Sequence, residues 1–343
     1  MKLSILFGGA SYEHEISIVS AITVKGKLDS FDLSYIFCDQ DHTFYNIPED
    51  KMKAKVFSSG EYKKLPILEL NRDGFTQKKF FGSKSIDGIV LNLIHGGDGE
   101  DGSIAALLDF YSINFIGPRK EASVFSFDKE YTKWLASSLA VKTLQYAVVT
   151  RDDNKELAYP CIIKPACLGS SIGVSIVKSE DELEYALDVA FEFDSRVVVE
   201  PFIENVKEYN LAGCLTKKGM QFSIVEEPNK EEFLDFDKKY MDFSRSEQVL
   251  KADISDELVQ KMRDTFEKIY RGHFEGALIR CDFFVINNTV YLNEINPIPG
   301  SMANYLFEDF ELLISDLASS LPRLKRPSVN YQYIHNISKA KGK

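Results

Sequence analysis

Apolar and polar runs divide the start of the chain into strands and a helix. Leu3 to Phe7 is an apolar run that ends at Gly8-Gly9, and Leu33 to Cys38 is a second such run. Between them, Ile16 to Leu28 has the apolar spacing of a helix. A strand, a helix and a strand in this order predict a βαβ unit and therefore a parallel sheet. Residues 39–85 are polar and mixed, and their pattern predicts no clear order of elements.

The same criteria predict the elements of the remaining chain. We expect helices over Ser103 to Tyr111, Lys129 to Leu139, Asp256 to Tyr270 and about Asn304 to Ser320, and another that follows Ser179. We expect strands over Gly88 to Ile94, Phe115 to Ile116, Tyr146 to Thr150, Cys161 to Lys164, Val174 to Lys178, Val197 to Glu200, Tyr209 to Leu215 and Gln221 to Glu226. The length of 343 residues suggests two or three domains, and a division into three would cover residues 1–120, 121–203 and 204–343.

The run from Arg280 to Gly300 spells two strands around the polar turn Asn287-Asn288-Thr289. If these three residues form the loop, Asp282 lies opposite Glu294 and Arg280 lies opposite Asn296. Two carboxylates and an amide oxygen then converge, and hard oxygen ligands of this kind suit Mg²⁺. The alternative interpretation is a surface hairpin with an ordinary cross-strand polar cluster.

Two glycine-rich turns each follow a predicted parallel strand. Gly8 to Glu15 joins the first strand to its helix, and His95 to Gly102 follows a later strand. The carboxyl ends of parallel strands meet at one edge of the sheet, where ligands bind, so we expect both turns there. Glu13 could point into a cleft to hold an ammonium group, or it could merely complement the helix dipole.

Lys164 ends a strand where its cation can meet a phosphate group, and Gly169 to Gly173 supplies small residues that can cover phosphate oxygens. The extended segment after Glu200 could offer backbone groups to an adenine edge, and Glu208 could accept hydrogen bonds from ribose hydroxyls. Lys239-Tyr240 lies in a run that could form a lid. For each of these segments, the alternative is an ordinary turn, linker or solvated loop.

Composition narrows the class of protein. The 343 residues carry a net charge of −11, which argues against a nucleic-acid partner. The five cysteines are scattered and include no Cys-x-x-Cys pair, as expected for reduced thiols in the cytoplasm. No stretch approaches the roughly 18 apolar residues of a membrane span, and we expect no membrane partner. The C-terminal Lys-Ala-Lys-Gly-Lys is expected to be a frayed end.

Together these segments resemble the D-alanine–D-alanine ligases of the ATP-grasp superfamily, over nearly the whole chain. The resemblance rests on eight pieces in order: the motifs of the two glycine turns, Asp128-Lys129-x-x-Thr132-Lys133, Lys164-Pro165-x-x-x-Gly169-Ser170-Ser171-x-Gly173, Glu200 with Glu208, Lys239-Tyr240, Arg280-x-Asp282, and Glu294-x-Asn296-x-x-Pro299-Gly300. It implies an α/β (α+β) chain with an ATP-grasp fold and an N-terminal Rossmann-like parallel-sheet domain. The implied reaction joins two D-alanines at the expense of ATP, through an acyl phosphate, for peptidoglycan synthesis.

The resemblance also implies a role for each matching residue. Asp282, Glu294 and Asn296 would hold two Mg²⁺ (or Mn²⁺) ions, while Lys129, Lys164 and Lys239 would neutralise phosphate oxygens. Arg280 and the Gly300 N–H would form the oxyanion site, Glu13 would hold the first D-alanine, Ser170 and Tyr240 would bridge to Glu13, and His95 would face the acyl phosphate. The ATP site would include Ser171, Glu200, Pro201, Phe202, Ile203, Glu208 and Asn293. A homodimer through the first domain is also implied.

The chain departs from the common family pattern at a few positions. Pro201-Phe202 stands where a Lys-Trp pair is frequent, and Tyr305-Leu306 stands where a Ser-Leu pair often contacts the second D-alanine. Three alternatives remain: a ligase that makes D-alanyl-D-lactate, a non-catalytic nucleotide-binding protein on this scaffold, and a Rossmann oxidoreductase. The absence of Gly-x-Gly-x-x-Gly after the first strand weakens the last of these.

Overall fold

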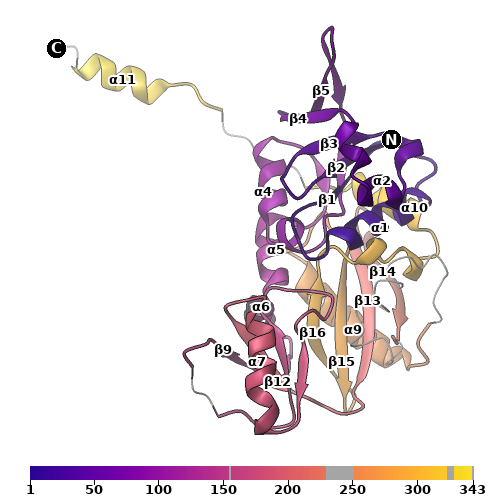
Figure 1. Ribbon diagram of the computed structural model, residues 1–343, viewed down its shortest axis with the longest axis vertical. Helices are drawn as coiled ribbons and strands as arrows, with labels where there is room; N and C mark the ends of the chain where they lie inside the picture. The colour runs from indigo at the N-terminus through magenta and orange to yellow at the C-terminus, as the bar shows by residue number, and fades with distance from the viewer. Residues whose placement is uncertain (154–155, 229–250, 323–327, 342–343) are drawn as a thin grey trace.

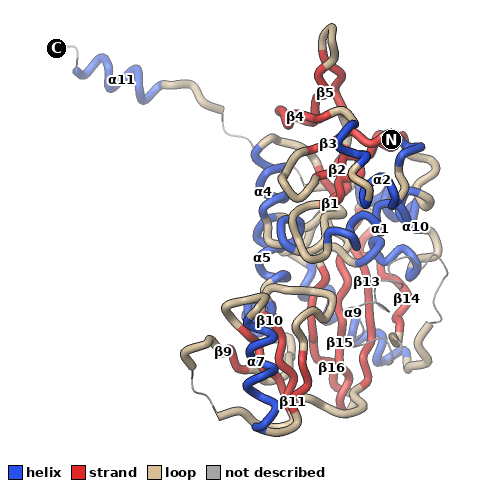
Figure 2. The backbone as a smooth tube through the Cα atoms, viewed as in Figure 1, coloured by secondary structure: helices blue, strands red, loops and turns tan. Residues whose placement is uncertain are grey.

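The computed structural model of the protein describes residues 1–153, 156–228, 251–322 and 328–341. These residues form three β-sheets with helices packed around them (Figure 1). Figure 2 shows the eight-stranded sheet at one end of the molecule and the two four-stranded sheets at the other. Lys239 and Tyr240, the predicted lid residues, lie outside the described residues.

The first sheet has the strand order β6-β5-β4-β3-β2-β1-β7-β8. Its parallel half confirms the predicted βαβ unit and consists of β1 (Lys2–Gly8), β2 (Asp32–Cys38), β7 (Ile89–Asn92) and β8 (Phe115–Ile116). Its antiparallel half consists of β3 (Phe44–Ile47), β4 (Ile67–Asn71), β5 (Gly74–Lys78) and β6 (Ser83–Ile86). This half falls within residues 39–85, where the sequence predicted no order. Its strands are short, and β6 has three exposed residues and one buried residue, so the apolar pattern is weak.

Alternate residues of β1 reach opposite faces of this sheet, as strand geometry requires. Leu3, Ile5 and Phe7 belong to a core shared with helix α1 (His14–Lys25). Leu6 points the other way and packs in a second core with helix α4 (Ser103–Phe110). The sheet therefore lies between two helical layers, and its β1 and β7 ends lead into the glycine-rich turns.

The second sheet has the order β11-β10-β12-β9 and its own small core. Its elements are β9 (Ala147–Val149), β10 (Cys161–Pro165), β11 (Ser175–Val177), β12 (Val197–Pro201) and the covering helix α7 (Leu183–Phe191). Two helices precede it in the chain, α5 (Lys120–Phe127) and α6 (Lys129–Ser138). The sequence predicted α6 but missed α5.

The third sheet has the order β14-β13-β15-β16 and shares the first core with the N-terminal sheet. Its strands are β13 (Lys207–Thr216), β14 (Gly219–Glu226), β15 (Ile279–Ile286) and β16 (Thr289–Asn296). Helix α9 (Asp256–Tyr270) has the predicted bounds. Because the first and third sheets share a core, residues far apart in the sequence come together where these two sheets pack.

The predicted helix over Asn304 to Ser320 begins too early. The chain instead forms η5 (Gly300–Leu306), a 3₁₀ segment, and then α10 (Phe310–Ala318). Ser301, Met302 and Ala303 have positive φ angles, which interrupt a regular helix. The Asp309 carboxylate accepts a hydrogen bond from Leu312 N at 2.9 Å and so caps a new helix.

The first three residues of the C-terminal Lys-Ala-Lys-Gly-Lys belong to helix α11 (Gln332–Lys341), which stands away from the rest of the chain (Figure 1), whereas Gly342 and Lys343 lie outside the described residues. The remaining short elements are α2 (Ala54–Ser58), α3 (Gly97–Glu100), η1 (Glu49–Lys51), η2 (Glu61–Lys64) and η3 (Glu180–Glu182). Across the described ranges, we find no helix with the length and apolar character that crossing a bilayer requires.

Candidate active site

The β15–β16 hairpin confirms the predicted pairing of the polar residues. Asp282 lies opposite Glu294, and Arg280 lies opposite Asn296. The predicted three-residue loop is wrong, however, because Ile286 pairs with Thr289 and leaves only Asn287 and Asn288 in the turn. Both asparagines have positive φ, 48° and 58°, as a two-residue hairpin of the favoured twist requires.

A β-bulge compensates for the shorter turn. The register shifts between Asp282 and Phe283, so that Phe283 pairs with Leu292 and Asn293 is the additional residue on β16. Leu292 and Ile295 are buried, whereas Asn293, Glu294 and Asn296 are all partly exposed. The bulge therefore places Asn293 on the same polar side as Glu294, where its Oδ1 accepts a hydrogen bond from Lys164 Nζ at 3.4 Å.

Asp282 is the electrostatic centre of this hairpin. Arg280 donates to both of its carboxylate oxygens, at 2.7 and 2.8 Å, and Asn296 Nδ2 donates to one of them at 3.0 Å. Burial raises the pKa of Asp282 to about 6, and Glu294 adds to the rise, while Arg280 opposes it. In Arg280, burial opposes the charged form, but Asp282 outweighs it and raises the pKa of the guanidinium.

The donor set fits a hard divalent cation. Two neighbouring carboxylates repel one another, and the raised pKa of Asp282 records that repulsion together with burial. Within the described ranges, His, Cys, Asp and Glu side chains form no group of three or more that could hold a metal. Asp282 and Glu294 would therefore need the Asn296 amide oxygen and oxygens of a bound phosphate to complete the shell, a pattern that suits Mg²⁺.

Glu200 on β12 lies between two ammonium groups. Lys164 Nζ on β10 donates to Glu200 Oε2 at 2.6 Å, and Lys133 Nζ on α6 donates to Glu200 Oε1. Burial alone would raise the pKa of Glu200, but Lys164 and Lys133 outweigh it and hold the pKa at about 2. Burial lowers the pKa of Lys133 in spite of this partner, whereas Lys164 has its pKa raised by Glu200 against the effect of burial.

The loop between β10 and β11 folds over the start of α6. Lys129 Nζ donates to the Leu168 carbonyl, and the Lys129 N–H donates to the Ala166 carbonyl at 2.9 Å. Ser170 and Ser171 have positive φ angles of 54° and 58°, so the loop turns sharply at the predicted phosphate-binding residues. Lys129 and Lys164 influence one another electrostatically, which places both cations beside this loop.

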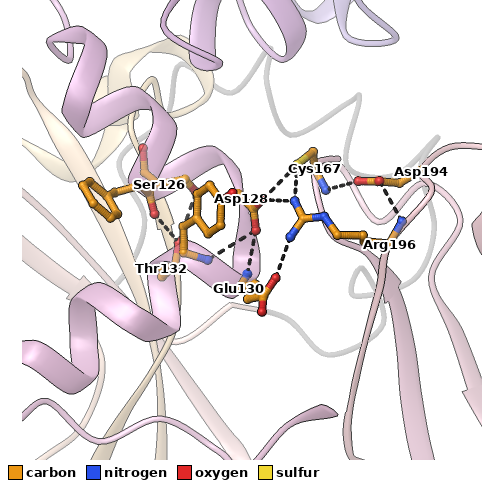
Figure 3. A network of polar contacts seen from close by, with 9 residues as sticks. Ser126, Asp128, Glu130, Thr132, Cys167, Asp194 and Arg196 are labelled. Carbon is orange, nitrogen blue, oxygen red and sulfur yellow. Dashed lines mark hydrogen bonds and ion pairs between the residues drawn. The ribbon is translucent and has the colours of Figure 1, made fainter. Parts of the chain in front are cut away.

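A network centred on Arg196 holds this loop against α6 (Figure 3). The Asp128 carboxylate caps α6 by accepting from Glu130 N at 2.9 Å, and it also accepts from the Arg196 guanidinium, which pairs with Glu130 as well. On the loop side, Asp194 accepts from Cys167 N at 2.8 Å and from Arg196 N at 3.0 Å. The loop and the helix that carries Lys129 are thus joined through charged side chains.

The two glycine-rich turns meet at one edge of the first sheet, as predicted. Ser11 Oγ donates to the His95 carbonyl at 2.6 Å, and Ala10 N donates to Asp98 at 2.8 Å. Glu13 is buried at the start of α1 and accepts a hydrogen bond from Ser170 Oγ, so the loop after β10 reaches the turn after β1. A Cβ on Gly96 would lie 2.6 Å from Glu13 Oε2, and its φ is 63°, so this position requires glycine.

His95 is buried, and its Nδ1 lies 3.8 Å from Glu100 Oε1. Its Nε2 lies 2.9 Å from Ser20 Oγ, which also accepts from Ser301 N at 3.0 Å, so Ser20 links His95 to the residue after Gly300. Burial lowers the pKa of His95 to about 4, which keeps the imidazole neutral at pH 7. Burial, with a further effect of Glu13, raises the pKa of the nearby Glu100 well above its usual value.

The predicted adenine and ribose residues lie along the end of β12 and the start of β13. Pro201 ends β12, Phe202 and Ile203 follow it, and Glu208 is the second residue of β13. The Phe202 N–H donates to the Pro160 carbonyl at 3.0 Å, so this backbone donor is already used within the chain. The Glu208 carboxylate, like that of Glu200, raises the pKa of Lys164, so both carboxylates lie near this ammonium group.

Three further charged residues contact this site without having been assigned a role from the sequence. Lys133 follows Lys129 by four residues on a predicted helix, so helical spacing could have placed both on one face. Glu100 lies within a glycine-rich motif that was identified, but its neighbours Glu13 and Glu294 come from other elements. Arg196 offers no local signal, because the two carboxylates with which it pairs are more than 60 residues away in sequence.

Comparisons with known proteins agree with this arrangement. Residues 2–118 match the family profile described as D-ala D-ala ligase N-terminus, and residues 129–310 match the profile described as D-ala D-ala ligase C-terminus. The chain is 66% identical over 345 residues to a D-alanine–D-alanine ligase of Sulfurimonas denitrificans, and 59% identical over 346 residues to one of a Sulfurovum species. Each alignment covers 100% of both chains.

Among solved structures, the D-alanine–D-alanine ligase from Helicobacter pylori is similar, with a TM-score of 0.85 and 50% sequence identity. The match covers 95% of this chain and 100% of that one. The mixed sheets and this structural similarity therefore define an ATP-grasp enzyme. The chain belongs to the D-alanine–D-alanine ligase family.

Proposed function

We propose that this protein is an ATP-dependent ligase that joins two D-alanine molecules into D-alanyl-D-alanine for cell-wall synthesis. The observation that carries the proposal is full-length similarity, at 66% and 59% identity, to proteins named D-alanine–D-alanine ligase. The candidate site supports it, because it gathers cations, carboxylates and glycine-rich turns from all three sheets. Such a ligase converts ATP and two D-alanines into ADP, phosphate and the dipeptide.

The first step transfers the terminal phosphoryl group of ATP to the carboxylate of one D-alanine, which forms an acyl phosphate. Both reactants are negatively charged, so the protein must mainly position them and neutralise charge. We assign this role to Lys129 and Lys164, which flank the loop that contains Ser170 and Ser171. Glu200, Glu208 and residues 201–203 are then the candidate contacts of the adenosine, and Asn293 supports Lys164.

The hairpin is the proposed site of two Mg²⁺ or Mn²⁺ ions, with Asp282, Glu294 and Asn296 as ligands. A divalent cation held by these residues would supply positive charge at the phosphate oxygens. Arg280 keeps the Asp282 carboxylate in a fixed orientation through two hydrogen bonds. Its guanidinium has five N–H donors, and two of these are used by Asp282.

The second step is attack of the other D-alanine amine on the acyl phosphate. We assign the oxyanion position of the tetrahedral intermediate to the remaining donors of Arg280 and to the Gly300 N–H. Donors of this type are worth about 3–4 kcal/mol each in related acyl transfers. Glu13, which Ser170 contacts, is the proposed partner of the first D-alanine's ammonium group. The neutral His95 can donate a hydrogen bond without adding a charge.

Several finer features belong to the same proposal. Lys239 and Tyr240 would close over the cleft, Tyr305 would shape the second D-alanine subsite, and the chain would act as a homodimer in the cytoplasm. The domains would comprise residues 1–120, 121–203 and 204–343. These features follow from the family resemblance and the reduced cysteines.

One assay tests the proposal and its alternatives. ADP release is measured with ATP and Mg²⁺ in the presence of D-alanine, D-lactate or D-serine as the second substrate. We expect release that requires D-alanine and yields D-alanyl-D-alanine. Use of D-lactate at neutral pH would contradict the amine preference, and ATP binding without turnover would favour a non-catalytic nucleotide-binding protein.

A further inference from the structure

The β5–β6 hairpin projects from the end of the first sheet (Figure 1). Phe80 and Phe81 lie in the turn between its two strands. Phe80 is 95% exposed and Phe81 is 87% exposed. Their rings contact each other edge to face, with centroids 4.8 Å apart, but this contact buries little of either ring. Adjacent, almost fully exposed phenylalanines on a projecting loop are costly in water, so they indicate a binding surface.

The residues around this pair are basic. Lys78 and Lys79 precede the phenylalanines and Lys84 follows them, and all three are exposed. Residues 77–86 contain no Asp or Glu, although the whole chain has a net charge of −11. Lys78 pairs with Glu69 on the neighbouring strand, which leaves the tip itself positively charged through Lys79 and Lys84. A cationic, aromatic tip on an acidic protein is suited to an anionic, apolar surface.

The hairpin is also remote from the proposed active site. β5 and β6 lie at one edge of the first sheet, whereas β1 and β7, whose ends carry the glycine-rich turns, lie near the other edge. Contact at the hairpin tip therefore leaves the proposed active site accessible to small substrates. Substitutions at the tip can therefore be tested for their effect on binding without altering catalytic residues.

We propose that the β5–β6 hairpin tip binds the surface of an anionic phospholipid membrane, with Phe80 and Phe81 entering the interface and Lys79 and Lys84 facing the lipid phosphates. Aromatic side chains partition favourably into this interface, and basic side chains gain from its negative potential. The proposal differs from the sequence-based expectation of no membrane partner, which rested on the lack of a spanning segment. A surface-bound tip needs no such segment.

Helix α11 is a second element with exposed apolar side chains, namely Tyr333, Ile334 and Ile337. This helix follows α10 in the chain, and it could bind a bilayer by itself as an amphipathic helix. The hairpin has the larger exposed aromatic surface, with two rings at one point. The experiment must therefore distinguish membrane binding by the hairpin from membrane binding by α11.

The test is co-sedimentation of the full-length protein with vesicles of phosphatidylglycerol, and with vesicles of phosphatidylcholine as the neutral comparison. We expect binding to phosphatidylglycerol that weakens as salt increases. Phe80→Ser with Phe81→Ser should lower the apparent affinity at least about tenfold, because two large apolar side chains no longer enter the interface. Lys79→Ala with Lys84→Ala should weaken binding and reduce its salt dependence.

Phe110→Ser is the matched control. Phe110 is 81% exposed at the end of α4 and is flanked by Asp109 and Tyr111 rather than by lysines, so its loss should leave binding unchanged. Ligase activity in the absence of vesicles should be the same in all of these variants and in the wild type. This readout separates a loss of membrane binding from a loss of folding.

Several results would overturn the proposal. Wild-type protein that stays in the supernatant with phosphatidylglycerol vesicles would do so directly. Loss of binding in a chain that ends at Ser328, with normal binding in the double Phe variant, would assign the membrane contact to α11. A lower molar mass of the double Phe variant in solution, measured by light scattering, would show instead that the tip joins two copies of the chain.

Discussion

The ammonium group of Lys133 donates a hydrogen bond to a carboxylate oxygen of Glu200, and each of these side chains is only 3% exposed. Lys133 comes from α6 and Glu200 from β12, so the pair joins a helix to the middle of the second sheet. The ammonium group of Lys164 donates a hydrogen bond to the other oxygen of the same carboxylate. A proposed phosphate-binding cation and a proposed nucleotide contact are thus positioned by a third residue that need not touch ATP.

Lys133→Met should therefore impair the site through its neighbours. We expect a loss of about 3 kcal/mol in folding stability, because a buried charge loses a partner. We also expect at least a roughly tenfold rise in the KM for ATP, since Glu200 and Lys164 become free to pair differently. Thermal unfolding and steady-state kinetics measure the two effects. Lys142→Met, at an exposed position, is the control, and a normal KM in Lys133→Met would contradict the positioning role.

Arg196→Met should loosen the loop after β10. Removal of the guanidinium leaves Asp128 and Glu130 without their shared partner and removes its own contact with Cys167 Sγ. We expect a destabilisation of about 1–3 kcal/mol and a higher KM for ATP. Arg151→Met removes an exposed ion pair with Asp188 in the same part of the chain and should cost less than about 1 kcal/mol. Equal effects of the two variants would refute a special role for Arg196.

His95 gives a pH prediction with a definite sign. The pKa is lowered from 6.5 to about 4 by burial, so between these values the unfolded chain binds a proton that the folded chain does not. Stability contributed by neutral His95 is therefore lost as the pH falls from 6.5 toward 4, by up to about 3 kcal/mol. His95→Asn should flatten this part of the stability profile. Thermal unfolding between pH 4 and pH 7 measures it, and an unchanged slope would show that other groups cause the acid sensitivity.

Glu294→Gln should separate catalysis from folding. The variant loses one of two facing carboxylates, so we expect at least a roughly 100-fold fall in kcat through loss of charge stabilisation. Ligand-free stability should change by less than about 1 kcal/mol, since the side chain is only partly buried and the amide is isosteric. Protection against thermal unfolding by Mg²⁺ with ADP should also diminish. Glu308→Gln is an exposed control, and near-normal turnover in Glu294→Gln would rule out the hairpin as the metal site.

The fold could be predicted in the segments whose apolar residues repeat with one clear period. The βαβ start and the bounds of α9 were correct because their patterns are long and regular. Residues 39–85 were not predicted because their strands are short, lie at a sheet edge and expose many side chains. Helix α5 was missed next to α6, since Asp128 ends one helix and caps the next with no intervening loop.

Within the site, the pairing of Asp282 with Glu294 was predicted correctly by an argument with two compensating errors. The loop was assumed to be one residue too long, and the bulge at Asn293 was not foreseen. Contacts between distant elements, such as Ser170 with Glu13 or Arg196 with Asp128, could not be inferred from spacing within one segment. The meeting of the two glycine-rich turns could be inferred, because the parallel pairing of β1 and β7 places both turns at the same edge of the sheet.

The bulge at Asn293 has a consequence for how the site can be altered. Leu292 and Ile295 both remain in the core, so Asn293 is an inserted residue that adds a polar group without replacing an apolar one. Deletion of Asn293 would leave Glu294 opposite Asp282 and every flanking residue on its present face. The β15–β16 hairpin is thus a regular two-stranded ribbon with one additional residue, so deletion of Asn293 should preserve the pairing of the ribbon while it removes the amide oxygen that accepts from Lys164.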